Sequence, residues 1–127
     1  MVIPTLEDIR LLLVEDEFFI LMDLRNVFEE AGARVTTATT VAEGLSATAA
    51  DGFDAAVLDV RLPDGEVFPV ATALTERRVP LVFHSGHVRA EDVSLQFPAA
   101  LTLSKPAREE ALINAVRRLV GAEGGPA

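Results

Sequence analysis

Two hydrophobic periods alternate along this chain, and their alternation leaves few folds open to it. Five short, nearly continuous apolar runs are each followed by a segment whose apolar residues recur at helical spacing. We predict strands at residues 9–14, 33–38, 54–58, 80–86 and 100–104. We predict helices at residues 18–31, 41–50, 66–78, 88–97 and 107–120. Strands and helices that alternate in this way form a parallel sheet covered on both faces.

This order of elements predicts an α/β fold of the (βα)5 type, with a doubly wound parallel sheet. Right-handed crossovers leave few topologies, and the flavodoxin-like strand order 2-1-3-4-5 is a common one. The length of 127 residues fits one domain, and hydrophobic residues make up 50% of the chain, enough for a core. We expect this domain at residues 1–120 and a flexible tail, GAEGGPA, at residues 121–127.

Local signals mark several element boundaries. Thr40 followed by Glu43 is a capping-box pattern, which predicts the helix that begins at residue 41. The stretch RLPDG at residues 61–65 is predicted to be a loop, because proline and glycine interrupt regular structure. Pro69 must then lie in the first turn of the helix at residues 66–78, where a missing N–H is tolerated.

The composition excludes several classes of protein. The formal net charge is −9 and the isoelectric point is near 4.6, which argues against nonspecific binding to nucleic acid or to anionic membranes. There is no cysteine, which excludes disulfides and thiolate metal sites. No apolar run reaches transmembrane length and no signal peptide is recognisable, so we expect a cytoplasmic protein.

Residues able to do chemistry stand at the carboxyl ends of four predicted strands. They are Glu15-Asp16-Glu17, Asp59, Ser85-Gly86 and Lys105-Pro106. In the order 2-1-3-4-5 these ends meet at the edge where open α/β sheets bind ligands. An all-carboxylate set favours Mg²⁺, and an aspartate can itself accept a phosphoryl group. A lysine and a serine can contact the oxygens of that group.

These four strand ends resemble the motifs of the response-regulator receiver domains of bacterial two-component signalling. The matching stretches are VEDE with Glu15 and Asp16, AVLDVRLPDG with Asp59, FHSG with Ser85, and SKP with Lys105. The resemblance covers about residues 9–120. It is specific because all four motifs occur in order, each at a predicted strand end.

The resemblance implies a phosphoryl-transfer site that depends on Mg²⁺. Asp59 is then the phosphoacceptor, and the donor is a phosphohistidine of a sensor histidine kinase or a histidine phosphotransfer protein. Asp16 is implied to be the main metal-binding acid, together with Asp59. Glu15 is implied to reach the metal through water, and the backbone carbonyl of Arg61 to be a further ligand.

The resemblance also implies roles for the residues that follow the fourth and fifth strands. Ser85 is similar to the hydroxyl that moves toward the phosphoryl group, and Lys105 to the lysine that pairs with it. Pro106 follows this lysine in a peptide bond that is often cis in the family. Glu17 has no implied role, and we expect it to be a solvated residue at a helix start.

The resemblance implies a signalling module rather than an enzyme. We expect a stand-alone receiver that signals or relays phosphate through protein–protein contacts, as a monomer or a weak homodimer. The expected partner surface comprises the helix at residues 88–97, the strand at residues 100–104 and the helix at residues 107–120.

The chain departs from the family at several positions. Thr102 stands where most receivers have an aromatic residue, so the usual coupling of the hydroxyl to that ring cannot operate in its standard form. This absence, with FHSG, resembles single-domain regulators that carry a phenylalanine-x-threonine-glycine stretch. Arg61 and His87 occupy positions that influence phosphorylation and dephosphorylation rates in the family. His87 is either a base for water or a solvated loop residue, and His84 is expected to be satisfied locally in its strand.

Three other functions remain open from the residues. A phosphatase of the haloacid-dehalogenase type needs an aspartate two positions after the nucleophile, where this chain has Arg61. A flavodoxin needs a phosphate loop after its first strand, and EDEFF would repel a phosphate. A degenerate receiver that acts only as a phosphorylation-independent interaction module also remains; it would fit an incomplete site, whereas this site has all four motifs.

Overall fold

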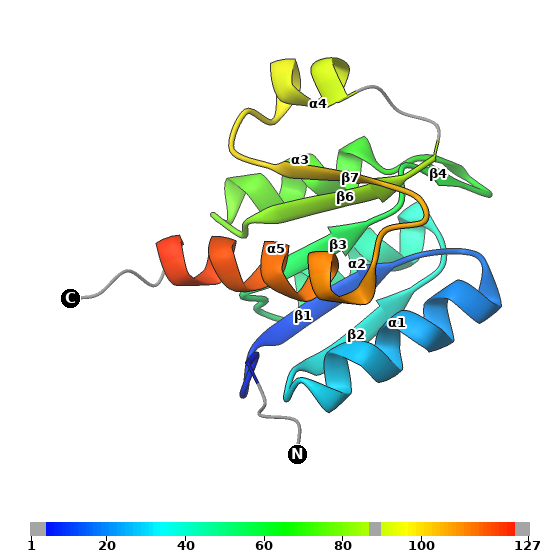
Figure 1. The fold of residues 1–127 in the computed structure, drawn as a ribbon. Helices are drawn as coiled ribbons and strands as arrows, with labels where there is room; N and C mark the ends of the chain where they lie inside the picture. The colour runs from blue at the N-terminus through cyan, green and yellow to red at the C-terminus, as the bar shows by residue number, and fades with distance from the viewer. Residues whose placement is uncertain (1–4, 87–89, 124–127) are drawn as a thin grey trace.

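The structure has the architecture that the alternation of periods predicted, a parallel sheet between two layers of helices (Figure 1). This computed structural model describes residues 5–86 and 90–123. Among these residues, five parallel strands pair in the order β2-β1-β3-β6-β7, which is the predicted order 2-1-3-4-5. The strands are β1 (Arg10–Val14), β2 (Arg34–Ala38), β3 (Ala55–Leu58), β6 (Leu81–Ser85) and β7 (Leu101–Ser104).

The helices divide between the two faces of the sheet. They are α1 (Phe18–Glu30), α2 (Val41–Ala50), α3 (Phe68–Glu76), α4 (Ala90–Gln96) and α5 (Glu109–Glu123). Alternate strand residues point to opposite faces, so Leu12 and Phe83 pack in the cluster under α2, α3 and α4. Leu11, Leu13 and Val82 pack in the second cluster, under α1 and α5. Residues 11–14 are buried on both faces, as the continuous apolar run predicted.

The predicted loop at residues 61–65 is instead a short β-hairpin. Strand β4 (Arg61–Leu62) pairs antiparallel with β5 (Gly65–Glu66). Leu62 is buried in the core and anchors the hairpin, and Gly65 adopts a φ of 135°, which a residue with a side chain rarely does. The sequence signals for a turn were correct, but two residue pairs are too short to show a strand period.

The helix boundaries differ from the predictions at a few places. Helix α3 begins at Phe68 rather than at residue 66, because Glu66 belongs to the hairpin, and Pro69 lies in its first turn as expected. Helix α5 begins at Glu109 and continues to Glu123, beyond the predicted end at residue 120. A glycine weakens a helix without having to end it, so Gly121 does not stop α5. The remaining tail, residues 124–127, lies outside the described residues.

The capping box at the start of α2 is confirmed, except that one of its partners is the preceding residue, Thr39. The Thr40 side chain accepts a hydrogen bond from the Glu43 N–H at 3.0 Å, as predicted. The Glu43 carboxylate accepts from the backbone N–H and the hydroxyl of Thr39, at 2.7 and 2.9 Å, rather than from Thr40. These two bonds are the main reason that the pKa of Glu43 is lowered.

A second cap reaches α2 from the hairpin, and no sequence signal indicated it. Asp64 accepts hydrogen bonds from the N–H groups of Val41 and Ala42, at 2.7 and 3.1 Å. With Thr40, it satisfies donors of the first turn, which have no partners within a helix. These bonds lower the pKa of Asp64 and connect the β4–β5 hairpin to the first turn of α2.

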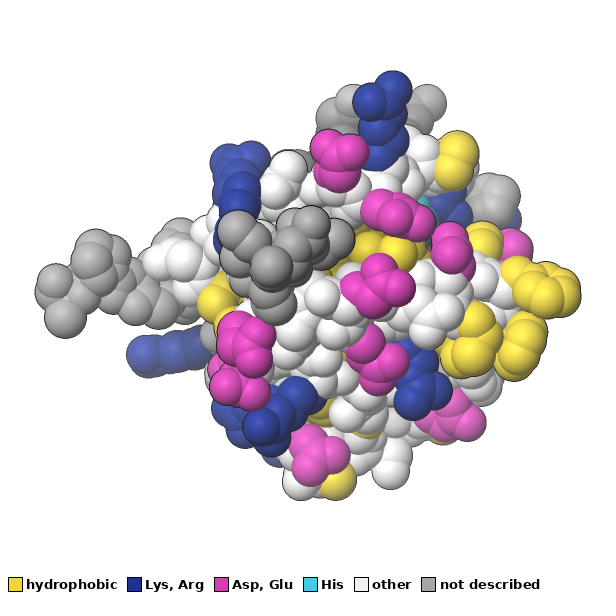
Figure 2. All heavy atoms as spheres, turned by 60° about the horizontal axis from the view of Figure 1, so that its bottom comes forward, with side chains coloured by type: hydrophobic (Ala, Val, Ile, Leu, Met, Phe, Trp, Pro, Cys, Tyr) yellow, Lys and Arg dark blue, Asp and Glu magenta, His cyan; other side chains and the backbone are white. Residues whose placement is uncertain are grey.

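The surface carries many acids and an exposed aromatic pair. Acidic side chains are spread over the face in Figure 2, while hydrophobic side chains gather at its right-hand end, the end toward which the strands point in Figure 1. Phe18 and Phe19, at the start of α1, are 63% and 84% exposed. Their rings meet edge to face with centroids 5.5 Å apart. Among the described residues, no helix combines the length and apolar character needed to cross a bilayer.

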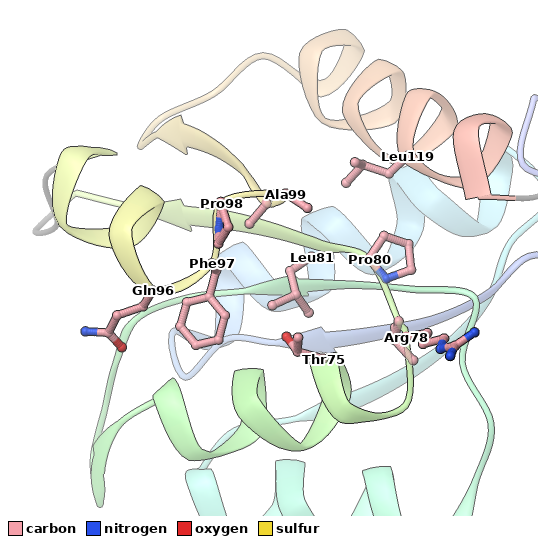
Figure 3. Close-up of a pocket in the computed structure, with 11 residues that line it drawn as sticks. Thr75, Arg78, Pro80, Leu81, Gln96, Phe97, Pro98, Ala99 and Leu119 are labelled. Atoms are coloured by element: carbon pink, nitrogen blue, oxygen red, sulfur yellow. The ribbon is translucent and has the colours of Figure 1, made fainter.

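An apolar cavity of about 420 Å³ lies at the opposite end of the sheet (Figure 3). Leu81 at the start of β6, Phe97 after α4 and Leu119 on α5 contribute to its lining. Among the described residues that line it, the polar side chains are Thr75, Arg78 and Gln96, and none of these is a carboxylate or an imidazole.

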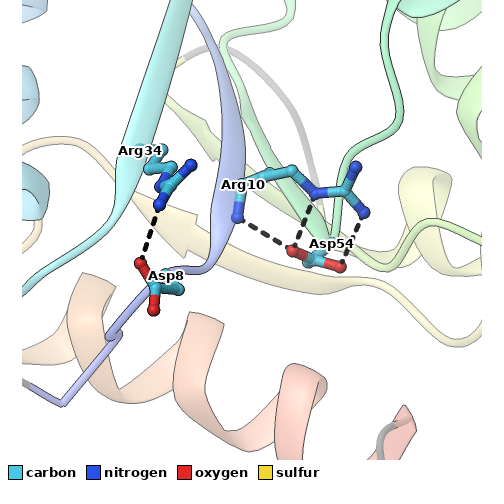
Figure 4. A network of polar contacts seen from close by, with 4 residues as sticks. All are labelled: Asp8, Arg10, Arg34 and Asp54. Atoms are coloured by element: carbon cyan, nitrogen blue, oxygen red, sulfur yellow. Dashed lines mark hydrogen bonds and ion pairs between the residues drawn. The ribbon is translucent and has the colours of Figure 1, made fainter.

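Exposed ion pairs join the starts of three strands (Figure 4). Arg10 donates to Asp54 through its backbone N–H at 2.9 Å and through its guanidinium at 3.4 Å. Arg34 donates to Asp8 at 3.2 Å. Exposed pairs of this kind stabilise a fold by less than about 1 kcal/mol each, so the edge depends mainly on the buried strands.

The second cap predicts a pH-dependent effect on stability. Asp64→Ala removes both acceptors, so we expect a lower thermal midpoint than wild type at neutral pH. A carboxyl whose pKa is lowered by folding stabilises the fold at pH values above its ordinary pKa, 3.8. This contribution is lost as the pH falls through the pKa of the folded state. The difference between the two proteins should therefore shrink in acid. Asp23→Ala, which removes an exposed carboxylate from α1, is the charge-matched control, and an equal loss in both variants would contradict this explanation.

Candidate functional site

Three carboxylates meet at the carboxyl edge of the sheet, as the strand ends predicted. Glu15 and Asp16 follow β1, and Asp59 follows β3, the neighbouring strand. One oxygen from each of the three lies within 4.8 Å of the others. Glu15 and Asp59 are buried, with 1% and 6% of their surface exposed, and Asp16 is exposed. Carboxylates this close together repel one another, and a nearby cation is needed to compensate their charge.

Lys105 supplies a cation to this cluster. Its ammonium lies 2.7 Å from a Glu15 oxygen and 3.1 Å from an Asp59 oxygen. Burial alone would lower the pKa of Lys105, but the hydrogen bonds and charges of Glu15 and Asp59 outweigh it and raise that pKa. Lys105 is also the only lysine in the sequence. The ammonium is therefore held protonated between two buried acids.

Glu15 is the most buried acid of the cluster. Burial raises its pKa, and the Lys105 ammonium and the Glu17 N–H act against this by donating hydrogen bonds, the second at 3.0 Å. The charge of Asp59 raises the pKa further. Glu17 is exposed at the start of α1, as expected, but its backbone N–H has a role that the sequence reasoning missed.

The remaining predicted site residues are placed as follows. Ser85 is buried at the end of β6, and its carbonyl accepts from the Lys105 N–H at 3.3 Å. The Lys105–Pro106 peptide bond is cis. Arg61 is exposed in β4, and the role of its carbonyl stays a prediction. His87 lies outside the described residues.

His84 differs from the expectation of a locally satisfied strand residue. It is buried, with 5% of its surface exposed, and its Nε2 accepts from the Ala107 N–H at 3.3 Å. The partner lies 23 residues away in the sequence, in the turn between β7 and α5. Sequence alone could indicate that a buried histidine needs a partner, but not that this turn provides it.

The site can hold a hard divalent cation. The donor set consists of carboxylate oxygens, which Mg²⁺ prefers, and the oxygens are close enough together to share one ion. The exposed carboxylate, Asp16, leaves the cluster open to solvent on one side. Together with the ammonium of Lys105, such a site can bind a phosphoryl group beside a nucleophilic carboxylate.

Comparisons with known proteins point to one family. A family model described as the response regulator receiver domain matches residues 11–117. Nodulation protein W of Bradyrhizobium diazoefficiens is 33% identical over 111 residues, which are 81% of this chain and 47% of that protein. A response regulator receiver protein from Sinorhizobium medicae is 30% identical in structure-based comparison, with a TM-score of 0.84, and the match covers 92% of this chain and 98% of that chain.

A more distant structure adds a metal-bound example of the fold. The receiver domain of the sensor histidine kinase PA1611 from Pseudomonas aeruginosa coordinates a magnesium ion in its active site cleft. It is 22% identical, has a TM-score of 0.77, and covers 90% of this chain and 98% of that chain. The chain spans about half the length of the curated relatives it matches, between 39% and 61%.

The ion pairs of Lys105 predict a measurable loss of stability. Lys105→Met keeps most of the aliphatic chain and removes the ammonium, which leaves two neighbouring buried carboxylates without their cation. We expect a loss of about 2 kcal/mol in the free energy of unfolding, less than for a fully buried pair because the lysine keeps some contact with water. Urea unfolding at neutral pH measures it.

Arg25→Met is the matched control for this experiment. It removes a cation from an exposed pair with Glu29, in which the side chains are 45% and 43% exposed. An exposed pair contributes little, so this variant should lose less than about 0.5 kcal/mol. Equal losses in the two variants would contradict the importance assigned to the buried pairs.

Proposed function

The chain belongs to the response regulator receiver family, and from this membership we propose that it accepts a phosphoryl group on Asp59 and passes on the signal by protein–protein contact. The proposal depends mainly on the position of Asp59. Its carboxylate is buried and lies 3.1 Å from the ammonium of Lys105, the only lysine, and two further acids lie beside it. This arrangement combines a nucleophile, a counter-ion for the transferred group and a cation site.

The proposed reaction is transfer of a phosphoryl group from a phosphohistidine. An oxygen of the Asp59 carboxylate forms a bond to phosphorus as the bond from phosphorus to the imidazole nitrogen breaks, and the nitrogen keeps the electron pair. Lys105 then pairs with the phosphoryl oxygens, and Ser85 donates a hydrogen bond to one of them. The product is an acyl phosphate on Asp59 and a free histidine on the donor.

Mg²⁺ is the proposed cofactor. Asp16 and Asp59 are the carboxylates that would hold it, with Glu15 reaching it through water and the carbonyl of Arg61 as a further ligand. The close approach of the three acids supports this assignment, as does the magnesium ion in the related receiver of PA1611. When bound, the ion neutralises negative charge on the phosphoryl oxygens.

The proposed donor is a sensor histidine kinase or a histidine phosphotransfer protein, which meets the receiver in the cytoplasm. Phe18 and Phe19 stand directly after the acidic stretch, and exposed aromatic pairs are typical anchors of protein interfaces. A donor protein that docks on them brings its imidazole to the edge where Asp59 lies. The small patch supports a transient contact, which suits a donor that must leave after transfer.

A haloacid-dehalogenase phosphatase is disfavoured by position 61. That chemistry needs a second aspartate as acid and base, and Arg61 is exposed on the hairpin instead. A phosphorylation-independent interaction module is the remaining alternative, and the following experiment distinguishes it.

Incubation with acetyl phosphate tests the reaction directly. We expect wild type to gain one phosphoryl group in the presence of Mg²⁺ and little or none after chelation, by intact mass and site mapping. Asp59→Asn should gain none, because the amide is not a nucleophile. A folded wild-type protein that never gains mass, either from acetyl phosphate or from a panel of phosphorylated histidine kinases, would favour the interaction module.

Docking and chemistry can be separated at α1. The experiment uses a purified histidine kinase that phosphorylates wild type. With this donor, the double variant Phe18→Ser, Phe19→Ser should accept the phosphoryl group about tenfold or more slowly, because buried aromatic anchors dominate interface energies. Labelling by acetyl phosphate should stay within about twofold, because the small donor needs no docking surface. Leu45→Ser, an exposed apolar residue on α2, is the control. Equal slowing with both donors would assign the two rings to the folding of the site instead.

A further inference from the structure

His84 occupies an unusual place for an ionisable side chain. It is the residue before Ser85 in β6, and it is buried with 5% of its surface exposed. Its neighbour two positions back, Val82, packs in the cluster under α1 and α5, so the imidazole lies on the α5 side of the sheet. The side chain is therefore directed away from the cluster that contains Phe83 and toward the chain entering α5.

The imidazole holds the turn that follows β7. Its Nε2 accepts a hydrogen bond from the Ala107 N–H at 3.3 Å. Two residues earlier in this turn, the Lys105 N–H donates to the Ser85 carbonyl, also at 3.3 Å. Consecutive residues of β6 thus fix the turn at two points, one on each side of Pro106, and Lys105 is itself the first of these points.

The protonation state of His84 suits this contact. Nε2 can accept only when it carries no proton, so the neutral ring with its proton on Nδ1 is the form that makes the bond. Burial lowers the pKa of His84, and the charge of Lys105 lowers it further, against the opposing effect of Asp59. The acceptor form is therefore favoured at neutral pH.

A fixed turn matters because Lys105 reaches far across the sheet edge. Its strand, β7, is separated from β1 by β6 and β3, a distance of about 14 Å at the usual strand spacing. The ammonium nevertheless contacts Glu15 at the end of β1 as well as Asp59 at the end of β3. A small shift of the turn would take the ammonium out of reach of one or both acids.

We propose that His84 is a positioning residue for phosphoryl transfer at Asp59, because its contact with Ala107 fixes the turn from which Lys105 reaches the phosphoacceptor. The inference rests on the proposed function of Asp59. In this role His84 acts through Lys105 rather than on the transferred group.

Two variants separate this role from simple packing. His84→Leu fills a similar volume and has no acceptor, whereas His84→Gln offers its side-chain oxygen at about the position of Nε2. We expect His84→Leu to slow labelling by acetyl phosphate with Mg²⁺ about three- to tenfold, the factor that corresponds to one neutral hydrogen bond. His84→Gln should recover most of the rate. In a Lys105→Met background, His84→Leu should slow the residual reaction less than about twofold, because the group that it positions is already gone.

A second readout does not depend on phosphorylation. Because the chain has one lysine, protein labelled with ¹³C-lysine gives an NMR signal from the Lys105 side chain alone. A fixed lysine shows two resolved ε-methylene proton shifts, and motion averages them. We expect two shifts in wild type and His84→Gln, and an averaged signal in His84→Leu that retains the dispersed backbone spectrum of a folded protein.

The outcomes distinguish the two levels of the argument. Equal slowing by His84→Leu with and without Lys105, or an unchanged lysine signal, would overturn the positioning role while leaving phosphorylation of Asp59 intact. A wild type that takes up no phosphoryl group would refute the proposed function and, with it, the role of His84 in transfer, although the lysine signal would still report whether His84 fixes Lys105.

Discussion

One ammonium between two buried carboxylates is the interaction on which the carboxyl edge of this sheet depends. Glu15 and Asp59 follow strands that are covered by helices on both faces, so water cannot screen their mutual repulsion fully. The contacts of Lys105 at 2.7 and 3.1 Å supply the compensating charge. Because the acids lie on β1 and β3 and the lysine follows β7, these contacts exist only when the sheet has its full strand order. The negative charge of the two acids is therefore balanced only when the chain adopts this topology.

The sequence was sufficient for the features that depend on hydrophobic period and on strand ends. Strands buried on both faces must be apolar along their whole length, so the run from Leu11 to Val14 could be assigned with its end point. Once the strand order was inferred, the meeting of Glu15, Asp59 and Lys105 followed, because parallel strands place their carboxyl ends at one edge. The capping box at Thr40 could also be predicted from the sequence, because its hydrogen bond joins residues only three positions apart.

Contacts between segments that are distant in sequence and have no periodicity could not be predicted. Asp64 caps α2 from a hairpin more than twenty residues away, and a lone aspartate in a turn gives no sign of its target. The hairpin itself is too short to show alternation. His84 was expected to form its hydrogen bond locally, but its Nε2 accepts from the Ala107 N–H, which follows α4 and β7 in the sequence. In each case the burial or capping requirement is visible in the sequence, whereas the partner is fixed only by the packed fold.

Strand β6 connects the carboxyl edge of the sheet to the helices on both of its faces. Thr102 of β7 pairs with Phe83 in register. Phe83 itself packs with Phe68 of α3 and Phe97 after α4, with ring centroids 6.2 and 5.6 Å away. The next residue, His84, holds the turn before α5, and Ser85 ends the strand at the site. Three consecutive residues therefore connect the carboxyl edge to α3, to α4 and to α5. Because β6 is paired on both sides, with β3 and with β7, all of these contacts extend from one strand whose backbone is held by its two neighbours.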